Sequence, residues 1–332
     1  MEIKQKPVVY LAPFQGITTH IFREVYTRFF GDVDKLFTAF FTGIQSERSL
    51  RSHAKELVTT HHAGVPVVPQ ILSKDAREML RFARMCHNRG FDEINWNLGC
   101  PFPRVARKKR GSGLLPYPEE IQSILEYLMP QIPVRLSVKC RLGYSDANEI
   151  LALLPVFHSF PLSELIVHAR LGVQMYKGQT DLVSFEEVLR NSKIPLVYNG
   201  DIFSPDGFNV VKRRFPSVQS WMLGRGVLAD PFLPALIKGE KLPSHPETVV
   251  RRYVDELYYA YRKIFHDDLR ALNRLKELWS YLSLSFDQPE RVFGKIKKTR
   301  SFAVYEEAVR YVFDSFGWQG LGGKKLTRNN LL

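Results

Sequence analysis

Short apolar runs recur along the first 223 residues of the chain. Each holds four to seven residues, most are rich in Val, Ile, Leu or aromatic side chains, and Gly, Pro or polar residues flank them, as is typical of β-strands. Segments between several of them, such as 74–90 and 118–130, carry apolar residues at helical spacing. We therefore predict eight strands, at 8-VVYLA, 35-KLFTAF, 65-VPVVPQI, 91-FDEINWN, 133-PVRLSVK, 164-ELIVHA, 194-IPLVYN and 219-QSWML.

Strands that alternate with helices form a parallel sheet. Eight such units within about 230 residues predict an α/β fold of the (β/α)8 TIM barrel type. An open, doubly wound sheet is the competing architecture. It requires a glycine-rich phosphate loop after the first strand, and 12-APFQG lacks the GxGxxG spacing.

The pattern changes after the polar, proline-bearing segment 238-KGEKLPSHP. Three long stretches, 247–265, 269–286 and 302–316, repeat apolar residues every three or four positions. We predict a barrel domain over residues 1–240 and a smaller, all-helical domain over residues 241–332.

The net charge of +13 changes the functional picture. So basic a chain attracts polyanions, of which nucleic acid is the most common, although a high net charge also simply keeps a protein soluble. Residues 241–332 hold 17 Lys and Arg against 11 Asp and Glu, so the predicted helical domain is about twice as basic per residue as the rest. The three scattered cysteines indicate a reducing cytoplasm, and we find neither a signal peptide nor a membrane span.

Polar residues stand at the ends of six consecutive predicted strands. In a parallel barrel these ends share one face, where active sites form. Each residue alone could equally be a hydrogen-bonded cap or a solvated rim group, but together they predict one site. They are Gln70, Asn97 with Cys100 just beyond it, Lys139, His168, the sequence 199-NGD and the sequence 224-GRG.

The 224-GRG sequence suits a phosphate, because glycine lets backbone N–H groups approach and Arg225 adds a charged fork. Two glycines also make an ordinary turn. A flavin mononucleotide (FMN) fits the rest of the site: Lys139 would stabilise negative charge on its reduced ring, and Gln70 would bond the ring's edge. We find no CxxC pair and no His spacing typical of a metal site.

The motifs 11-LAPFQGIT, 97-NLGCP, 111-GSGLL, 138-VKCRLG, 168-HAR, 199-NGD and 224-GRG, in this order, resemble those of the tRNA-dihydrouridine synthase family. The resemblance runs from about residue 8 to residue 236. It implies an enzyme that uses FMN and NADPH to reduce a uridine in the tRNA D-loop to 5,6-dihydrouridine, with tRNA as partner and no obligate protein partner evident. The residues expected to hold FMN are Pro13, Phe14, Gln15, Gln70, Lys139, His168, Asn199, Gly200, Asp201, Gly224 and Arg225.

Several positions depart from the family pattern. Phe14 and Gln15 follow Pro13 where Met and a small residue are usual, and 18-TTH lacks a common acidic residue. The sequence 169-ARL replaces Gly-Arg-Thr, and Cys140 replaces an aliphatic or hydroxyl residue. These changes touch loops expected to line the flavin and the path of the substrate.

Reduction of the uracil C5=C6 bond needs a hydride on one carbon and a proton on the other. The resemblance implies that flavin N5 delivers the hydride to C6 and that Cys100 protonates C5. A thiol with a pKa of about 8.5 is mostly protonated at neutral pH yet can release its proton. We expect Asn97 and Tyr176 to contact the uracil, which must leave its stack within the tRNA.

A basic run follows the cysteine, at Arg104, Arg107, Lys108, Lys109 and Arg110. Since nearby cations lower a thiol's pKa, we predict that the run points toward tRNA phosphate or that Cys100 is shielded from it; a solvated loop is the alternative. Further cations that could contact the tRNA are Arg251, Arg252, Arg262, Lys263, the segment 291-RVFGKIKKTR and 324-KK.

Two other functions stay open. An FMN-dependent barrel oxidoreductase acting on a small molecule, of the dihydroorotate dehydrogenase or ene-reductase type, would explain Lys139 and 224-GRG but leave the basic tail without a role. A non-catalytic tRNA-binding protein would explain the charge but not the combination of Cys100, Lys139, His168 and Arg225.

Overall fold

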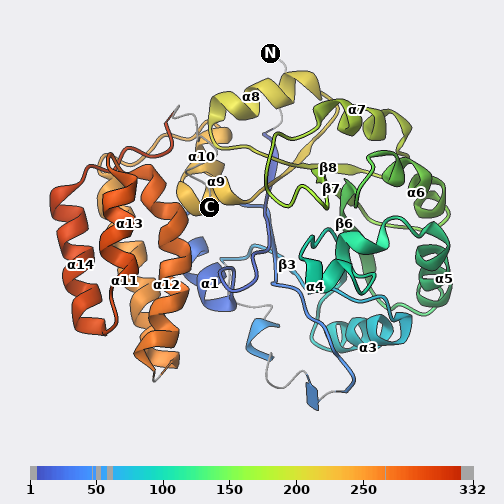
Figure 1. The fold of residues 1–332 in the computed structure, drawn as a ribbon, viewed down its shortest axis with the longest axis horizontal. Helices are drawn as coiled ribbons and strands as arrows, with labels where there is room; N and C mark the ends of the chain where they lie inside the picture. The colour runs from blue at the N-terminus through green and yellow to red at the C-terminus, as the bar shows by residue number, and fades with distance from the viewer. Residues whose placement is uncertain (1–5, 47, 50–53, 58–62, 266, 323–332) are drawn as a thin grey trace.

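The computed structural model describes residues 6–46, 48–49, 54–57, 63–265 and 267–322 (Figure 1). Its centre is a parallel sheet with the strand order β3-β2-β1-β9-β8-β7-β6-β5-β4. The strands are β1 (Val8–Leu11), β2 (Lys35–Phe37), β3 (Val67–Val68), β4 (Gln70–Ile71), β5 (Glu93–Leu98), β6 (Arg135–Gly143), β7 (Leu165–Leu171), β8 (Leu196–Asn199) and β9 (Ser220–Leu223).

The third predicted strand is divided at Pro69, which has no N–H group for a ladder hydrogen bond. Its first half, β3, pairs with β2, and its second half, β4, pairs with β5. The sheet therefore begins and ends on neighbouring residues and nearly closes into a barrel. All eight predicted strands are present, and the prediction of a TIM barrel is confirmed over an open sheet.

Three predicted strand ends are wrong. The second predicted strand, over residues 35–40, already ends at Phe37. The fifth predicted strand was to end at Lys139 but continues to Gly143, and the sixth was to end near His168 but continues to Leu171. Both extensions keep pairing with their neighbours across a bulge between Arg141 and Gly143. Two arginines thereby become strand residues at the rim of the barrel.

Helices cover the outside of the barrel. The predicted helices at 74–90 and 118–130 are α3 and α5, and α3 begins where the Asp75 carboxylate accepts hydrogen bonds from the N–H groups of Arg77 and Glu78. The helices of this part are α1 (His20–Phe29), α3 (Ala76–His87), α4 (Pro103–Ala106), α5 (Pro118–Leu128), α6 (Asn148–His158), α7 (Leu182–Asn191), α8 (Pro205–Arg214), α9 (Arg225–Ala229) and α10 (Leu233–Ile237), with the 3₁₀ turns η1 (Ala54–Glu56) and η2 (Gly111–Leu114).

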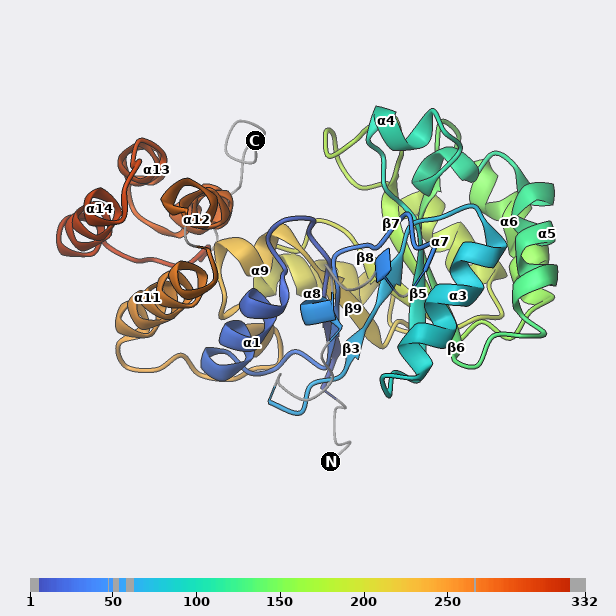
Figure 2. The same cartoon turned by 90° about the horizontal axis from the view of Figure 1, so that it is seen from below.

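The remaining helices stack together at one side of the barrel (Figures 1 and 2). They are α11 (Pro246–Ile264), α12 (Asp268–Leu282), α13 (Pro289–Lys297) and α14 (Phe302–Ser315), with the 3₁₀ turn η3 (Ser283–Ser285) after α12. The three predicted long helices are present, and α13 forms within the basic segment. The predicted contact at 324-KK lies outside the described residues. No helix in the described part of the chain is long and apolar enough to cross a membrane.

Aromatic packing joins these helices to the barrel. The Phe30 ring lies 4.9 Å from that of Tyr253 on α11 and 5.0 Å from that of Phe232. Tyr26 and Tyr253 are almost fully buried. Offset and edge-to-face aromatic contacts of this kind add to the free energy of apolar burial. They therefore stabilise the packing of α11 against α1.

Candidate active site

A cleft of about 1100 Å³ opens where the carboxyl ends of the strands meet. It gathers residues from six strand ends, the loop after β1 and helix α12. Four predicted residues of the basic run, Arg107, Lys108, Lys109 and Arg110, do not line it. The predicted residues that do line it are Pro13, Phe14, Gln15, Gln70, Asn97, Cys100, Arg104, Lys139, His168, Tyr176, Asn199, Gly200, Asp201, Gly224 and Arg225.

Asn97 holds the cysteine loop in place. Its side-chain oxygen accepts hydrogen bonds from the N–H groups of Gly99 (3.0 Å) and Cys100 (2.9 Å). Its amide donates to Gln70 (2.7 Å), whose own amide donates to Asn95 (2.8 Å). An NH₂ group carries two hydrogens, so Asn97, which is 8% exposed, has a second N–H that a ligand could accept from; Gln70 has no exposed surface.

The Cys100 thiol is 7% exposed. Burial raises its pKa above the ordinary value. The N–H group of Phe102 and the charges of Arg141 and Arg104 act in the opposite direction but do not cancel the effect of burial. Burial therefore keeps Cys100 a protonated thiol at neutral pH in spite of the nearby cations. A thiol has to stay protonated in this way if it is to act as an acid.

The 111-GSGLL sequence packs beneath this loop. Ser112 donates hydrogen bonds to the Cys100 carbonyl from its N–H group (3.0 Å) and from its hydroxyl (3.1 Å). Gly111 has a φ of +56°, and a Cβ there would lie 2.6 Å from the Cys100 carbonyl oxygen. Only glycine fits so close an approach in this backbone conformation.

Lys139 is buried among polar partners. Its ammonium donates to the Asn199 side-chain oxygen (2.8 Å), and the Asn199 amide donates to the Met222 carbonyl (2.9 Å). Burial first, and then the charge of Arg141, lowers the pKa of Lys139 to about 8. Two of its three N–H groups remain for a ligand, and a ligand that carries negative charge would raise the pKa of Lys139 again.

One carboxylate balances two arginines across the cleft. Asp201 accepts hydrogen bonds from Arg225 (2.6 Å) and from both terminal nitrogens of Arg170, one of them at 2.9 Å. The Arg170 side chain is 1% exposed. The lining of the cleft holds six cations against two carboxylates, which leaves a net positive cleft suited to an anion; the cations are Arg104, Lys139, Arg141, Arg170, Lys177 and Arg225, and the carboxylates are Asp201 and Glu277.

His168 is neutral in this surrounding. Burial, followed by the charges of Arg141, Lys139, Arg170 and Arg225, holds its pKa well below the ordinary value. Its Nε2 atom lies 3.2 Å from the Arg170 guanidinium. An arginine can only donate, so Nε2 accepts and the ring proton sits on Nδ1.

Arg141 and Arg170 line the cleft but were not among the predicted site residues. Arg141 donates to the carbonyls of Gly99 (3.0 Å), Leu171 (2.7 Å) and Met175 (2.6 Å). It therefore ties the cysteine loop to the loop that carries Tyr176, whose ring centre lies 5.3 Å from the guanidinium. The available signal was the strand period of two, since each arginine follows a predicted site residue at position i+2 on the same face.

The helical part of the chain also reaches the cleft, through Glu277, Ser280 and Tyr281 of α12. The Tyr281 ring packs edge-on against Phe14, with 6.1 Å between ring centres. Nothing in the spacing of apolar residues along α12 distinguishes these positions from an ordinary solvated face.

The basic run lies on and after α4, at the rim of the cleft. Arg104, Arg107 and Lys108 are exposed. Lys109 is held by Glu120 (2.6 Å) and lies 3.7 Å from the centre of the Tyr117 ring. The exposed residues of the run can therefore contact a large anionic partner, whereas Lys109 stabilises the fold.

No cluster of His, Cys, Asp and Glu among the described residues could hold a metal ion. The fold is a TIM barrel, and its net positive cleft contains a buried thiol. The chain belongs to the dihydrouridine synthase (Dus) family, whose model matches residues 10–307. It is accordingly an enzyme, an oxidoreductase of the flavin-dependent class that the motifs indicated.

Named relatives match over nearly the whole chain. A tRNA-dihydrouridine(16) synthase of Neisseria meningitidis is 27% identical over 95% of this chain and 96% of its own length, and one of Vibrio parahaemolyticus is 29% identical over 91% and 96%. A tRNA-dihydrouridine synthase B of Pasteurella multocida is 28% identical over 76% and 78%. Among solved structures, a 2-naphthoyl-CoA reductase with its ligand shares the fold, with a TM-score of 0.55 and 11% identity over 73% of this chain and 51% of that one.

Proposed function

We propose that this chain is a tRNA-dihydrouridine synthase that uses FMN and NADPH to reduce a D-loop uridine of tRNA. The observation that carries the proposal is a buried, protonated thiol at Cys100 in a cationic cleft that is open to solvent, in a chain of the dihydrouridine synthase family. The cytoplasm, where tRNA is found, is the compartment we propose.

The cleft fits FMN by volume and by charge. Its 1100 Å³ exceeds the usual size of a small-molecule pocket and leaves room for a nucleotide beside a cofactor. Lys139 and Gln70 would contact the flavin ring, and Arg225 with the first N–H groups of α9 would hold the phosphate, since those N–H groups have no acceptor within the helix. Bound FMN, kept reduced by NADPH, supplies the hydride.

Cys100 would supply the proton to C5 of the uracil. The raised pKa keeps hydrogen on sulfur until the carbon accepts it. Asn97 accepts a hydrogen bond from the Cys100 N–H group and Ser112 donates one to the Cys100 carbonyl, and these two bonds would fix the sulfur in the cleft. The remaining N–H of Asn97 and the exposed ring of Tyr176 are placed to orient the uracil.

The tRNA would lie across the barrel rim and the helical domain, which we place at residues 241–332. Arg104, Arg107 and Lys108 project at the rim, and α11 and α13 carry further exposed cations. Phe102, which is 46% exposed beside Cys100, offers a stacking surface to a base next to the target.

We propose uridine 16 as the target. The relatives named for position 16 match this chain over 87% to 95% of its length, the helical part included, whereas the synthases B of Pasteurella multocida and Vibrio vulnificus match 76% and 70%. Mass spectrometry of tRNA fragments after reaction would locate the new dihydrouridine; modification at position 17 or 20 alone would contradict this assignment.

Incubation of tRNA with the purified protein, FMN and NADPH tests the function directly. We expect dihydrouridine to form, in tRNA from a strain that lacks it. If bound flavin is reduced but no tRNA ever gains dihydrouridine, the small-molecule oxidoreductase becomes the better account. If the purified protein binds tRNA but no flavin, the non-catalytic binding protein does.

Neutralising the rim cations is expected to weaken tRNA binding without touching the cofactor. In the variant Arg107→Ala/Lys108→Ala, we expect the slope of log affinity against log salt to fall by about one unit per lost phosphate contact. Lys193→Ala/Arg213→Ala removes the same charge at the amino-terminal end of the strands and is the control. Equal salt slopes for both variants would show that the run is only a solvated loop.

The Lys139 ammonium predicts a pH limit on cofactor binding. FMN contacts favour its charged form, so affinity for FMN is full below pH 8 and falls as the pH rises through the pKa of about 8. Fluorescence titrations of the apoprotein between pH 6 and 10 measure this limit. Lys139→Met should bind FMN more weakly and lose the pH step; an unchanged step would assign it to another group.

A further inference from the structure

The loop of residues 13–19, between β1 and α1, forms one wall of the cleft through Pro13, Phe14 and Gln15. The Phe14 ring lies against Gly224, where a Cβ would come within 3.2 Å of it. The position of this ring therefore limits the space beside 224-GRG, the proposed phosphate-binding site.

Thr18 fixes Phe14 from behind. The Phe14 N–H group donates to the Thr18 hydroxyl oxygen (2.8 Å), and the hydroxyl donates to the Phe14 carbonyl (3.1 Å). Thr18 has no exposed surface. The Phe14 carbonyl also accepts from the N–H groups of Ile17 (3.2 Å) and Thr18 (3.1 Å). Thr18 thus holds Phe14 through both its side chain and its backbone, and a shift of Thr18 would move the wall of the cleft.

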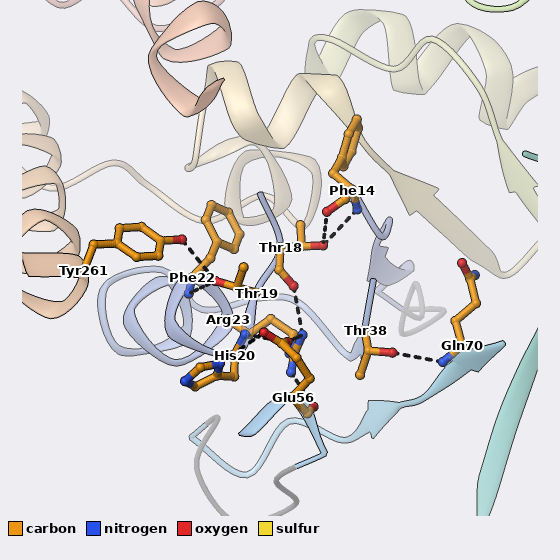
Figure 3. A network of polar contacts seen from close by, with 10 residues as sticks. All are labelled: Phe14, Thr18, Thr19, His20, Phe22, Arg23, Thr38, Glu56, Gln70 and Tyr261. Carbon is orange, nitrogen blue, oxygen red and sulfur yellow. Dashed lines mark hydrogen bonds and ion pairs between the residues drawn. The ribbon is translucent and has the colours of Figure 1, made fainter. Parts of the chain in front are cut away.

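Arg23 fixes Thr18 in turn. Its side chain is fully buried, and it donates to the Thr18 carbonyl (2.8 Å), the Glu56 carbonyl (2.9 Å) and the Glu56 carboxylate (3.2 Å). Figure 3 shows these contacts converging behind the loop. A buried guanidinium needs such a counter-charge, because removal of its partner leaves a charge in a medium of low polarity.

Glu56 comes from η1, remote in sequence from the loop. Its carboxylate also accepts from the His20 N–H group (2.8 Å) and lies 3.1 Å from His20 Nδ1. Burial acts to raise the pKa of Glu56, but the contacts with His20 and Arg23 outweigh it and hold the pKa below the ordinary value. The first turn of α1 has no acidic residue of its own, so Glu56 supplies negative charge to the helix N-terminus.

The other side of the loop rests on the helical part of the chain. Tyr261 of α11 shares a hydrogen bond with Thr19 (3.0 Å), and Arg274 of α12 donates to the Gly16 carbonyl (3.0 Å). These contacts join the loop to α11 and α12, whereas Arg23 and Glu56 join it to η1.

We propose that Glu56 and Arg23 are positioning residues for FMN. Through Thr18 they hold Phe14 in the position where its ring forms part of the binding site for the flavin and its phosphate. The inference rests on the proposed binding of FMN. It assigns a function to a carboxylate that no motif in the sequence singles out, and to Arg23, which makes no contact with the cleft.

Titration of the apoprotein with FMN, followed by quenching of flavin fluorescence, tests the proposal. Glu56→Gln is expected to raise the Kd for FMN about tenfold, the size of one lost charge-assisted hydrogen bond. Thr18→Val, which keeps Arg23 and Glu56 paired and so leaves no buried charge without its partner, should also raise the Kd. Adding His20→Asp to Glu56→Gln returns negative charge beside Arg23 and should recover part of the affinity.

Glu164→Gln is the matched control. Glu164 is 8% exposed, and it accepts from Lys35 (2.9 Å) and from the Tyr10 hydroxyl (2.9 Å) at the amino-terminal end of β7, away from the cleft. We expect it to lower the melting temperature while leaving the Kd for FMN unchanged.

Two outcomes would count against the proposal in different ways. If wild-type protein binds FMN and Glu56→Gln and Thr18→Val bind it equally well, the network is only structural and this inference is wrong. If the wild-type protein binds no FMN, the proposed cofactor itself is wrong and the inference falls with it.

Discussion

Replacement of Cys100 by alanine is expected to lower the rate of dihydrouridine formation by about 10²- to 10⁴-fold, the usual contribution of a positioned general acid. The protein should keep its FMN and its affinity for tRNA, because Asn97 and Ser112 hold the backbone N–H and carbonyl of residue 100, and both bonds remain in the variant. Single-turnover reaction of reduced, FMN-loaded protein with tRNA measures the effect on chemistry alone.

Cys86→Ala is the control for this experiment. Cys86 is a buried thiol on α3 with no place in the cleft, and its loss should leave single-turnover rates within a few-fold of wild type. If Cys100→Ala reacts as fast as Cys86→Ala, another group delivers the proton. If reduction of FMN by NADPH also slows in Cys100→Ala, the substitution has disturbed the cofactor and the test must be repeated with Cys100→Ser.

The barrel could be predicted from the sequence because each strand carries its own signal. Runs of β-branched and aromatic residues bounded by turn residues are local features, and the parallel order follows from their alternation with helices. Where the prediction was wrong, at the ends of β6 and β7, the strands continue through Arg141 and Arg170. Charged residues normally mark the end of a buried strand, and only tertiary contacts with loop carbonyls and Asp201 keep these two inside.

The residues that line the cleft could be predicted from the sequence better than the residues that hold them in place. Residues at the ends of strands meet for topological reasons, so Gln70, Lys139 and Arg225 could be grouped without knowledge of any distance. The contacts of Glu56 with Arg23 and of Tyr281 with Phe14 join segments far apart in sequence. Side chains in such contacts have no spacing that could have revealed them, because their partners are set by packing.

Asp201→Asn should be among the most destabilising substitutions in the cleft. The side chain keeps its shape, but Arg170, 1% exposed, and Arg225, 10% exposed, lose their shared counter-charge. Removal of one partner of a buried ion pair lowers the free energy of unfolding by about 3 to 5 kcal/mol. Because Asp201 is 28% exposed, we expect a loss near the lower end of this range, about 3 kcal/mol. Denaturant unfolding of the apoprotein measures it.

Two further variants test whether the loss of stability in Asp201→Asn comes from the unpaired arginines. Asp92→Asn removes a carboxylate from an exposed pair with Arg135, in which the Asp92 side chain is 87% exposed, and should lower the free energy of unfolding by less than about 1 kcal/mol. Arg170→Leu/Asp201→Asn removes the buried charge together with its partner and should be more stable than Asp201→Asn alone. If that double variant is the less stable of the two, Arg170 supports the fold through its bond to the Gly178 carbonyl and its contact with His168, and charge balance is not the reason for Asp201.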